Sequence, residues 1–319
     1  MYAGYFPRFN INEIEDRARL LPIHLATQLN PFNIILYSQL YGWSWFDHYM
    51  NKTAATRRVL LTEVLSYAGI SERTTTAIKK IDRELFTPKD LTLFSYLNWS
   101  IPIGAGTCLS APGVTAIMCD ELTGDLNGVG VEVGVGVGYH AHLLLTINPR
   151  LRIIGYEAST YAASRARDLA KNLGSTRLNI VNESFSESSQ IEHELALAYH
   201  TAVSHHHPSR NIAGALLEGA RYVFPRALTS TEYFTEPTDE WLHGLFPTYD
   251  RYRVLGVSTA CSLATYRVID GVLQQTNCMY GVRFVGWRDK VVDGSTTMSN
   301  FGLTELTRAY SLRERYEGK

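Results

Sequence analysis

Three glycines and one glutamate in this chain have the spacing of a nucleoside-binding site. Gly134, Gly136 and Gly138 stand at alternate positions directly after an apolar run, where glycine costs backbone entropy. A glycine-rich turn between a strand and the next helix lets a ligand approach the backbone and presents the free amides of the helix N-terminus. Glu157 lies 19 residues after Gly138, close to the interval of about 20 at which an acid accepts hydrogen bonds from ribose hydroxyls. We therefore expect a nucleoside to bind at this turn.

The spacing of the glycines bears on which nucleoside cofactor would bind. NAD and S-adenosylmethionine both use a turn of this kind. The dinucleotide pattern is G-x-G-x-x-G, whereas this chain reads G-x-G-x-G with Glu132 two residues before the first glycine. The form E/D-x-G-x-G-x-G is associated with methyltransferases, so the pattern favours S-adenosylmethionine.

Strand-like and helix-like segments alternate around the glycine turn. Short apolar, β-branched runs predict strands at 130–135, 152–157, 178–182, 200–204 and 220–225. Helical patterns fall between them at 139–147, 161–173 and 211–219. Strands separated by helices imply a parallel sheet covered on both faces. We expect an α/β protein with a Rossmann-like, mostly parallel central sheet, helices on both faces and a helical N-terminal extension.

The residues before this sheet predict helices and suggest a domain organisation. Within 57–88, apolar spacing predicts one helix that ends at Gly69 and a second that Ser71 caps and Pro88 ends. Residues 1–55 carry aromatic-rich patches that cover a cleft, bind a partner or complete the core. We divide the chain into an N-terminal extension at 1–55, a main domain at 56–290 and a tail at 291–319. Within the main domain we expect a helical lead-in at 56–100, a cofactor-binding core at 101–225 and the C-terminal part of the sheet at 226–290.

Composition and charge argue against several classes of protein. The chain has 319 residues, 45% of them hydrophobic and 19% charged, with a formal net charge of −1. This length and composition predict a globular protein of one large or two modest domains. No basic run predicts nucleic-acid binding, and no window is apolar enough to predict a membrane span or an export signal. The four cysteines, which lie far apart without a CxxC pair, are Cys108, Cys119, Cys261 and Cys278. We therefore expect neither a zinc site nor a disulfide framework, and we expect a cytoplasmic location.

Several segments follow the motif order of one known family. The sequence reads DRELFTP at 82–88, IPIGAGTCLSAPGVTAIMCDEL at 101–122, VEVGVGVGYHAHLL at 131–144 and LLEGARYVFP at 216–225. These segments resemble the protein-L-isoaspartate O-methyltransferases, which typically read R-x-x-F-V-P, I-G-x-G-x-T-I-S-x-P and L-E-I-G-T-G-S-G-Y. A further segment, MYGVRFVGW at 279–287, is similar to a late strand of that family. The resemblance covers roughly 57–290.

The resemblance implies methyl transfer from S-adenosylmethionine to a carboxylate oxygen of a peptide or protein. A carboxylate is already a nucleophile near neutral pH, because its pKa lies about three units below 7, so no strong general base is needed. The family's central serine falls on Ser110, which the resemblance makes the catalytic residue, with Cys108 beside it in the substrate pocket. Apart from the resemblance, a serine near proline is an ordinary turn or helix cap.

The resemblance also implies which residues hold the cofactor. Glu132 and the turn Gly134–Gly138 would shape the pocket for the methionine moiety, and Glu157 with Ala158 would hold the ribose. Two positions of the turn that are small and polar in the family are Val135 and Val137 here, so backbone amides must supply the hydrogen bonds.

The adenine contact is a looser match. Glu183 falls where the family has the aspartate of G-D-G, which would meet the adenine amino group. The flanking glycines are Asn182 and Ser184 in this chain. A Glu183 that faces solvent is therefore an equal alternative.

The segment 199–211 departs most from the family and bears on the substrate. His205 and His206 replace small residues at the carboxyl edge of the sheet, where we expect them to line the substrate mouth and attract an acidic peptide; surface histidines are the alternative. We predict no metal site, because adjacent residues point in different directions and no ligand spacing accompanies them.

Three functions are compatible with these residues. The changed histidines, the lost threonine at Cys108 and the long extension favour a dedicated peptide or protein carboxylate, such as one in a natural-product peptide. Generic repair of isoaspartyl residues is the first alternative. A non-catalytic scaffold that keeps the fold is the second.

Overall fold

The computed structural model of the chain describes residues 51–98, 100–104, 107–124, 127–201, 207–227 and 259–284. These residues form two compact units, 51–117 and 118–284. Residues 1–50 of the predicted extension and the tail at 291–319 lie outside the described residues, so the predicted domain boundaries stay predictions.

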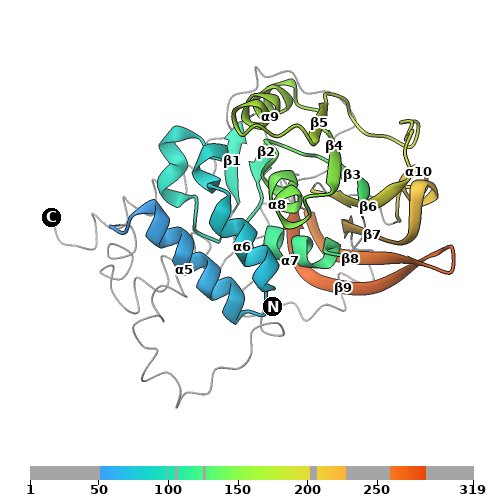
Figure 1. The fold of residues 1–319 in the computed structure, drawn as a ribbon, viewed down its shortest axis with the longest axis horizontal. Coiled ribbons are helices and arrows are strands. Elements are labelled where there is room, and N and C mark those ends of the chain that lie inside the picture. The colour runs from blue at the N-terminus through green and yellow to red at the C-terminus, as the bar shows by residue number, and fades with distance from the viewer. Residues whose placement is uncertain are drawn as a thin grey trace, which may run out of the picture. The chain divides into compact units, whose positions relative to one another are not determined.

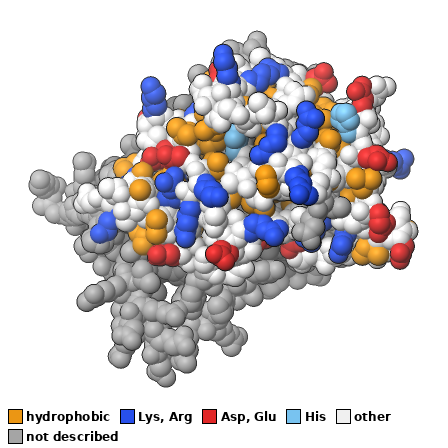
Figure 2. Space-filling view, in the orientation of Figure 1, with side chains coloured by type: hydrophobic (Ala, Val, Ile, Leu, Met, Phe, Trp, Pro, Cys, Tyr) orange, Lys and Arg blue, Asp and Glu red, His pale blue; other side chains and the backbone are white. Residues whose placement is uncertain are grey.

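On the face drawn in Figure 2, Lys and Arg side chains lie among Asp and Glu, so this face does not carry charge of a single sign.

The first unit begins with the two predicted helices, α5 (Ala54–Tyr67) and α6 (Glu72–Lys80). Ser71 caps α6 as expected, since its side chain accepts a hydrogen bond from the amide of Thr74. The prediction that α6 continues to Pro88 is wrong. Ile81 is extended, and the Asp82 side chain accepts from the amide of Glu84 and so starts the 3₁₀ helix η3 (Arg83–Phe86). A second 3₁₀ helix, η4 (Lys89–Phe94), follows.

A short hairpin completes this unit. Strands β1 (Ile101–Gly104) and β2 (Thr107–Leu109) pair antiparallel, and helix α7 (Pro112–Leu122) begins directly afterwards and runs across the boundary between the units. The core consists of fully buried apolar side chains from α5, α6, η3, the segment after η4 and the hairpin, among them Leu61, Ile78, Phe86, Leu97 and Ile101.

The second unit is built on a seven-stranded sheet with the order β5-β4-β3-β6-β7-β8-β9. The strands are β3 (Gly128–Val133), β4 (Leu151–Tyr156), β5 (Leu178–Val181), β6 (Leu195–His200), β7 (Leu216–Ala227), β8 (Thr259–Ile269) and β9 (Val272–Phe284). The first five strands of this order pair in parallel, and the last two pairings are antiparallel. The prediction of a mostly parallel sheet is therefore confirmed.

Helices cover both faces of this sheet, as predicted. They are α8 (Tyr139–Ile147), α9 (Thr160–Asn172) and α10 (Arg210–Ala215), and Figure 1 shows α8 over one face. Val131 and Val133 of β3 pack in one apolar cluster with Ile212 of α10. Glu132 between them points to the opposite face, because successive side chains of a strand alternate. There it meets Tyr199, whose ring lies against His140 of α8.

Two predicted elements are wrong in position. The strand predicted at 200–204 is β6, which ends at His200, and residues 202–204 lie outside the described residues. The helix predicted at 211–219 stops at Ala215, because Leu216 pairs with Leu195 and begins β7. The run LALAYH of β6 is buried at every residue. Buried parallel strands read as continuous apolar runs and lack the alternation that identifies a strand from sequence.

The sheet order places the glycine turn at its centre. The chain order reverses at β3, which pairs with β4 on one side and β6 on the other. Open α/β sheets bind ligands at the carboxyl ends of the strands at such a reversal. The turn between β3 and α8 occupies this position.

Candidate functional site

The three glycines of the turn have backbone conformations that other residues rarely adopt. The φ angles of Gly134, Gly136 and Gly138 are 83°, 56° and 86°, in the left-handed region that favours glycine. The amides of Gly134 and Val135 both donate to the carbonyl of Tyr156, at 2.8 and 3.0 Å. The turn therefore needs glycine for its own conformation, and it is tied to the end of β4.

The two valines of the turn point into the core. Val135 and Val137 are buried, and a Cβ added to Gly155 of β4 would lie 2.9 Å from the Val135 side chain. Val135 thus packs directly on the neighbouring strand. The partly exposed residues of the turn are Gly134 and Gly136, so the turn presents main chain at its surface.

Glu157 follows β4 and connects three elements. One carboxylate oxygen accepts the amide of Gly136 and the other accepts the amide of Ser159, both at 2.8 Å. The backbone carbonyl of Glu157 accepts from the side chain of Asn182 at 2.9 Å, beyond the end of β5. Each carboxylate oxygen has a second lone pair. The acid predicted from its interval to Gly138 is therefore adjacent to the turn and 6% exposed.

Helix α8 starts differently from four other helices of the chain. Four helices, α5, α6, α9 and α10, begin after a Ser or Thr whose side chain accepts a backbone amide: Thr53, Ser71, Ser159 and Ser209. Helix α8 begins after Gly138, and no side chain of the described residues caps it. The first amides of a helix have no partner within the helix, and its dipole favours an electron-rich group there. The start of α8 is thus suited to accept a ligand.

Glu132 lies behind the turn in a buried polar group. It is 1% exposed, and Tyr199 donates its hydroxyl to one carboxyl oxygen at 2.7 Å. Burial raises the pKa of Glu132 well above its usual range, the Tyr199 hydrogen bond lowers it, and the charge of Glu157 raises it. Burial lowers the pKa of His140 to about 3. Burial therefore favours the uncharged form of both groups, and a direct role of Glu132 in the methionine pocket stays a prediction.

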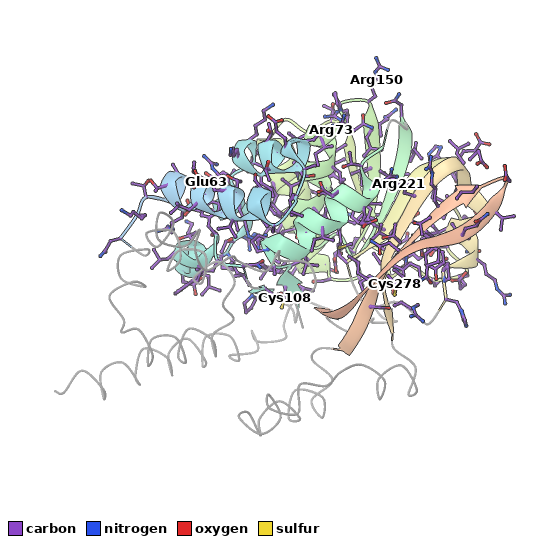
Figure 3. The ribbon with its side chains drawn as sticks, turned by 90° about the horizontal axis from the view of Figure 1, so that it is seen from below. Glu63, Arg73, Cys108, Arg150, Arg221 and Cys278 are labelled. Atoms are coloured by element: carbon purple, nitrogen blue, oxygen red, sulfur yellow. The ribbon has the colours of Figure 1, made fainter. Side chains whose placement is uncertain are left out.

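Ser110 lies in the first unit, in the segment between β2 and α7, which two side chains hold. Its backbone carbonyl accepts from a guanidinium nitrogen of Arg83 at 2.7 Å, and Arg83 is fully buried. Beyond Ser110, the amide of Gly113 donates to the side chain of Asn98 at 2.7 Å. A Cβ on Gly113 would lie 2.8 Å from that side chain, so glycine leaves the room that Asn98 needs. Cys108 of β2, labelled in Figure 3, is half-buried in the same unit.

Some of the predicted residues contribute no observed contact to the turn. Glu183 is exposed after β5, and Ala158 is partly exposed between Glu157 and Ser159. His205 and His206 lie outside the described residues.

Within the residues that the structure describes, no group of three or more His, Cys, Asp or Glu could hold a metal ion. No helix in that part of the chain is both long and apolar enough to span a membrane.

The comparisons with known proteins concern the family of the chain and its fold. The family model described as protein-L-isoaspartate(D-aspartate) O-methyltransferase matches residues 56–229. The chain belongs to this family. The family resemblance expected from the sequence motifs is thereby confirmed.

Relatives within the protein-L-isoaspartate O-methyltransferase family match only part of their length. The enzyme of Fervidobacterium nodosum is 31% identical over 122 residues, which cover 38% of this chain and 58% of the relative. That of Methanothrix thermoacetophila is 36% identical over 104 residues, which cover 32% of this chain and 46% of the relative. The chain thus spans about half the length of the curated relatives it matches.

A solved structure from the family supports the fold. The protein-L-isoaspartate O-methyltransferase of Plasmodium falciparum, solved with S-adenosyl-L-homocysteine, has a TM-score of 0.54 and 15% identity. The similarity covers 72% of this chain and 97% of that one. A second protein-L-isoaspartate O-methyltransferase structure has a TM-score of 0.52 and 16% identity. The predicted Rossmann-like methyltransferase fold is confirmed.

Sequence reasoning missed three residues of the candidate site. Asn182 stands where the family has a glycine, and its side chain ties the end of β5 to Glu157. Arg83 belongs to the segment DRELFTP, whose resemblance to the family motif could have pointed to it. Its contact with Ser110, however, joins residues that lie 27 positions apart in the chain. Asn98 had no signal, because its partner Gly113 lies across the hairpin.

Proposed function

We propose that this protein transfers a methyl group from S-adenosylmethionine to a carboxylate of a peptide or protein. The observation that carries the proposal is the main-chain turn at the end of β3, in which Glu157 accepts the amide of Gly136 beside the uncapped start of α8. The family assignment supports the reaction class. The solved relative from Plasmodium falciparum, which holds S-adenosyl-L-homocysteine, supports the cofactor.

The described residues fit this cofactor. Each carboxylate oxygen of Glu157 accepts one backbone amide beside the turn, and a carboxylate oxygen can accept more than one hydrogen bond, as an acid that also holds a ribose hydroxyl must. Gly134 and Gly136 offer main chain without side chains, so a ligand can approach closely. When bound, S-adenosylmethionine supplies an electrophilic methyl group on a sulfonium.

Methylation of a carboxylate requires little acid–base catalysis by the protein. A carboxylate with a pKa near 4 is ionised at neutral pH and needs no general base. The chain has to orient the attacking oxygen and remove its water. We assign Ser110 to hold the second carboxylate oxygen through its hydroxyl, with Arg83 fixing the backbone of that residue.

Two classes of acceptor are distinguishable. The names of the relatives favour an isoaspartyl carboxylate. Cys108 favours a narrower substrate range, because a thiol is a weak hydrogen-bond donor and acceptor compared with the hydroxyl expected from the family motif. We therefore propose a dedicated peptide or protein carboxylate as the natural acceptor, and isoaspartyl repair as the second candidate.

The test uses the full chain with methyl-labelled S-adenosylmethionine and a panel of peptides. The panel contains isoaspartyl peptides with varied flanking residues, the matching aspartyl peptides and versions with a blocked C-terminus. The base-labile label measures carboxyl methyl esters. Rapid methylation of every isoaspartyl peptide would favour repair, whereas strong dependence on flanking sequence would favour a dedicated substrate. Cofactor binding without ester on any acceptor would favour a scaffold, and no cofactor binding would refute the proposal.

A further inference from the structure

A cavity lies at the amino edge of the sheet in the second unit, at the opposite ends of the strands from the glycine turn. Its volume is about 280 Å³. It is lined by the last residues of α7 and α8 and by residues near the starts of β4, β6 and β7, with one residue from β8. None of the residues assigned to methyl transfer lines it.

The cavity has an apolar floor and a basic wall. Leu122, Leu144 and Leu197 are buried residues that line it. Arg221 of β7 and Arg267 of β8 form the wall, and they stand directly opposite each other in the antiparallel pairing of those strands. Like charges directly opposite each other destabilise a sheet, and arginine does not lose its charge in proteins. An anion between the two guanidinium groups would remove this repulsion.

The described residues do not provide that anion. Within them, which omit 125 and 126 after the end of α7, neither Arg221 nor Arg267 has a carboxylate at ion-pair distance. The two ion pairs found in that part of the chain join Arg57 to Glu84 and Arg58 to Asp82. The basic wall is thus not neutralised by an ion pair within the described part of the chain.

Capping of helix ends accounts for some arginines at this edge, but not for Arg267. Arg177 donates to the carbonyls of Leu145, Asn148 and Leu151 at 2.9 to 3.2 Å, around the end of α8. Arg221 donates one of its five N–H groups to the carbonyl of Glu121 in α7 at 2.9 Å. In the described part of the chain, no hydrogen bond or ion pair is found for the side chain of Arg267.

Two glycines leave space beside the basic wall. A Cβ on Gly124 would lie 3.5 Å from the Arg221 guanidinium, and a Cβ on Gly219 would lie 3.9 Å from that of Arg267. Gly219 also has a φ of 77°, which favours glycine. The space next to both cations is therefore open to a ligand group.

We propose that this cavity binds a small oxyanion with a short apolar body. A carboxylate or phosphate group would take the N–H donors of Arg221 and Arg267, since a guanidinium matches the geometry of both groups. The hydrocarbon part would lie on the leucine floor. The site is independent of the methyl-transfer site, because it uses none of its residues.

The experiment follows the backbone amides of the full ¹⁵N-labelled chain by NMR. Hexanoate, hexanol and inorganic phosphate are the three probes, at constant ionic strength. Hexanoate is expected to shift the signals of Gly124 and Gly219 and to leave that of Gly136 in place. Hexanol is expected to bind at least about tenfold more weakly than hexanoate, because it lacks the charge-assisted interaction with the arginines. Binding of phosphate at the same signals would identify a phosphate group as the preferred oxyanion. Equal binding of hexanol and hexanoate, or no shift at Gly124 and Gly219 with any probe, would overturn the proposal.

A pair of variants tests the basic wall. Arg267→Gln removes one exposed cation of the site, whereas Arg150→Gln removes an exposed arginine of the same edge that does not line the cavity. Figure 3 shows Arg150 projecting outward and Arg221 lying among the strands. Arg267→Gln is expected to weaken oxyanion binding at least about fivefold, and Arg150→Gln to leave it unchanged. Equal weakening by both variants would show general charge attraction and overturn the site; unfolding curves verify that both variants are folded.

Discussion

Replacement of Glu157 by glutamine tests both the structure of the turn and its ligand. The carboxylate accepts the amides of Gly136 and Ser159, each at 2.8 Å. A glutamine keeps the volume but has one oxygen, so its NH₂ group faces one of the two amide donors. Hydrogen bonds to charged groups contribute about 1.5–3 kcal/mol each. We expect Glu157→Gln to lower the free energy of unfolding by about 2 kcal/mol.

The same substitution should also weaken cofactor binding. A carboxylate accepts from both ribose hydroxyls, whereas the amide accepts at a single oxygen. The loss of one charge-assisted bond of about 1.5–3 kcal/mol corresponds to a tenfold to hundredfold rise in Kd for S-adenosylmethionine. The lost contact to Gly136 adds to this effect, because it loosens the turn that the cofactor contacts.

The assay is calorimetric titration with S-adenosylmethionine, combined with urea unfolding of the same preparations. Asp168→Asn is the control, because Asp168 is an exposed acid on α9. It should leave the affinity and the unfolding free energy unchanged. A Glu157→Gln protein that unfolds about 2 kcal/mol more easily, yet binds the cofactor within twofold of the wild type, would show that Glu157 is structural only. That result would refute the assignment of the ribose to this acid.

Three further predictions concern the acceptor side and the buried polar group. Ser110→Ala should lower kcat about a hundredfold, the typical loss of one transition-state donor, with the calorimetric Kd of the cofactor unchanged; an equally fast variant excludes Ser110. Arg83→Lys should lower kcat more than it raises KM, because lysine lacks the planar fork that holds the Ser110 carbonyl. The same variant should reduce the unfolding free energy by about 2 kcal/mol. Ser110→Ala keeps that carbonyl and should therefore not show the stability loss. Glu132→Gln should gain stability over the wild type as pH rises above about 4.3, because burial raises the pKa of the folded carboxyl above that of the unfolded one, so the wild type loses stability as its unfolded carboxyl ionises. Urea unfolding at pH 5 to 8 measures this gain, and parallel curves for the two proteins would contradict the raised pKa of Glu132.

The centre of the second unit could be predicted from sequence because its signals are local. Helix α8 spans Tyr139–Ile147, the predicted bounds, since the glycines mark its start and the apolar run its length. Glu157 is predicted from its place at the end of the second predicted strand and from its interval to Gly138. Both signals depend on fewer than about 25 residues of chain, the scale of one strand, turn and helix.

The parts that sequence missed depend on distant partners. Strand β6 is specified by its pairing with β3 and β7, and its leucines and alanines show no alternation because both faces are buried. The contacts of Arg83 and Asn98 depend on how the hairpin folds back on the helical lead-in. No single-sequence pattern records such contacts, because each joins two segments whose spacing is not fixed by a turn or a helix.

The geometry of the turn is set by the chain's own contacts, and this bears on its use. Three left-handed glycines, the packing of Val135 on Gly155 and the Glu157 carboxylate on Gly136 each constrain the same five residues. A segment constrained in this way loses little conformational freedom when a ligand binds, and pre-organisation of this kind improves affinity. An exposed loop without function gains nothing from a conformation that disfavours every residue except glycine at three positions. The conformational cost of three glycines is explained if the main chain itself contacts the ligand, as the proposed binding of a nucleoside sulfonium requires.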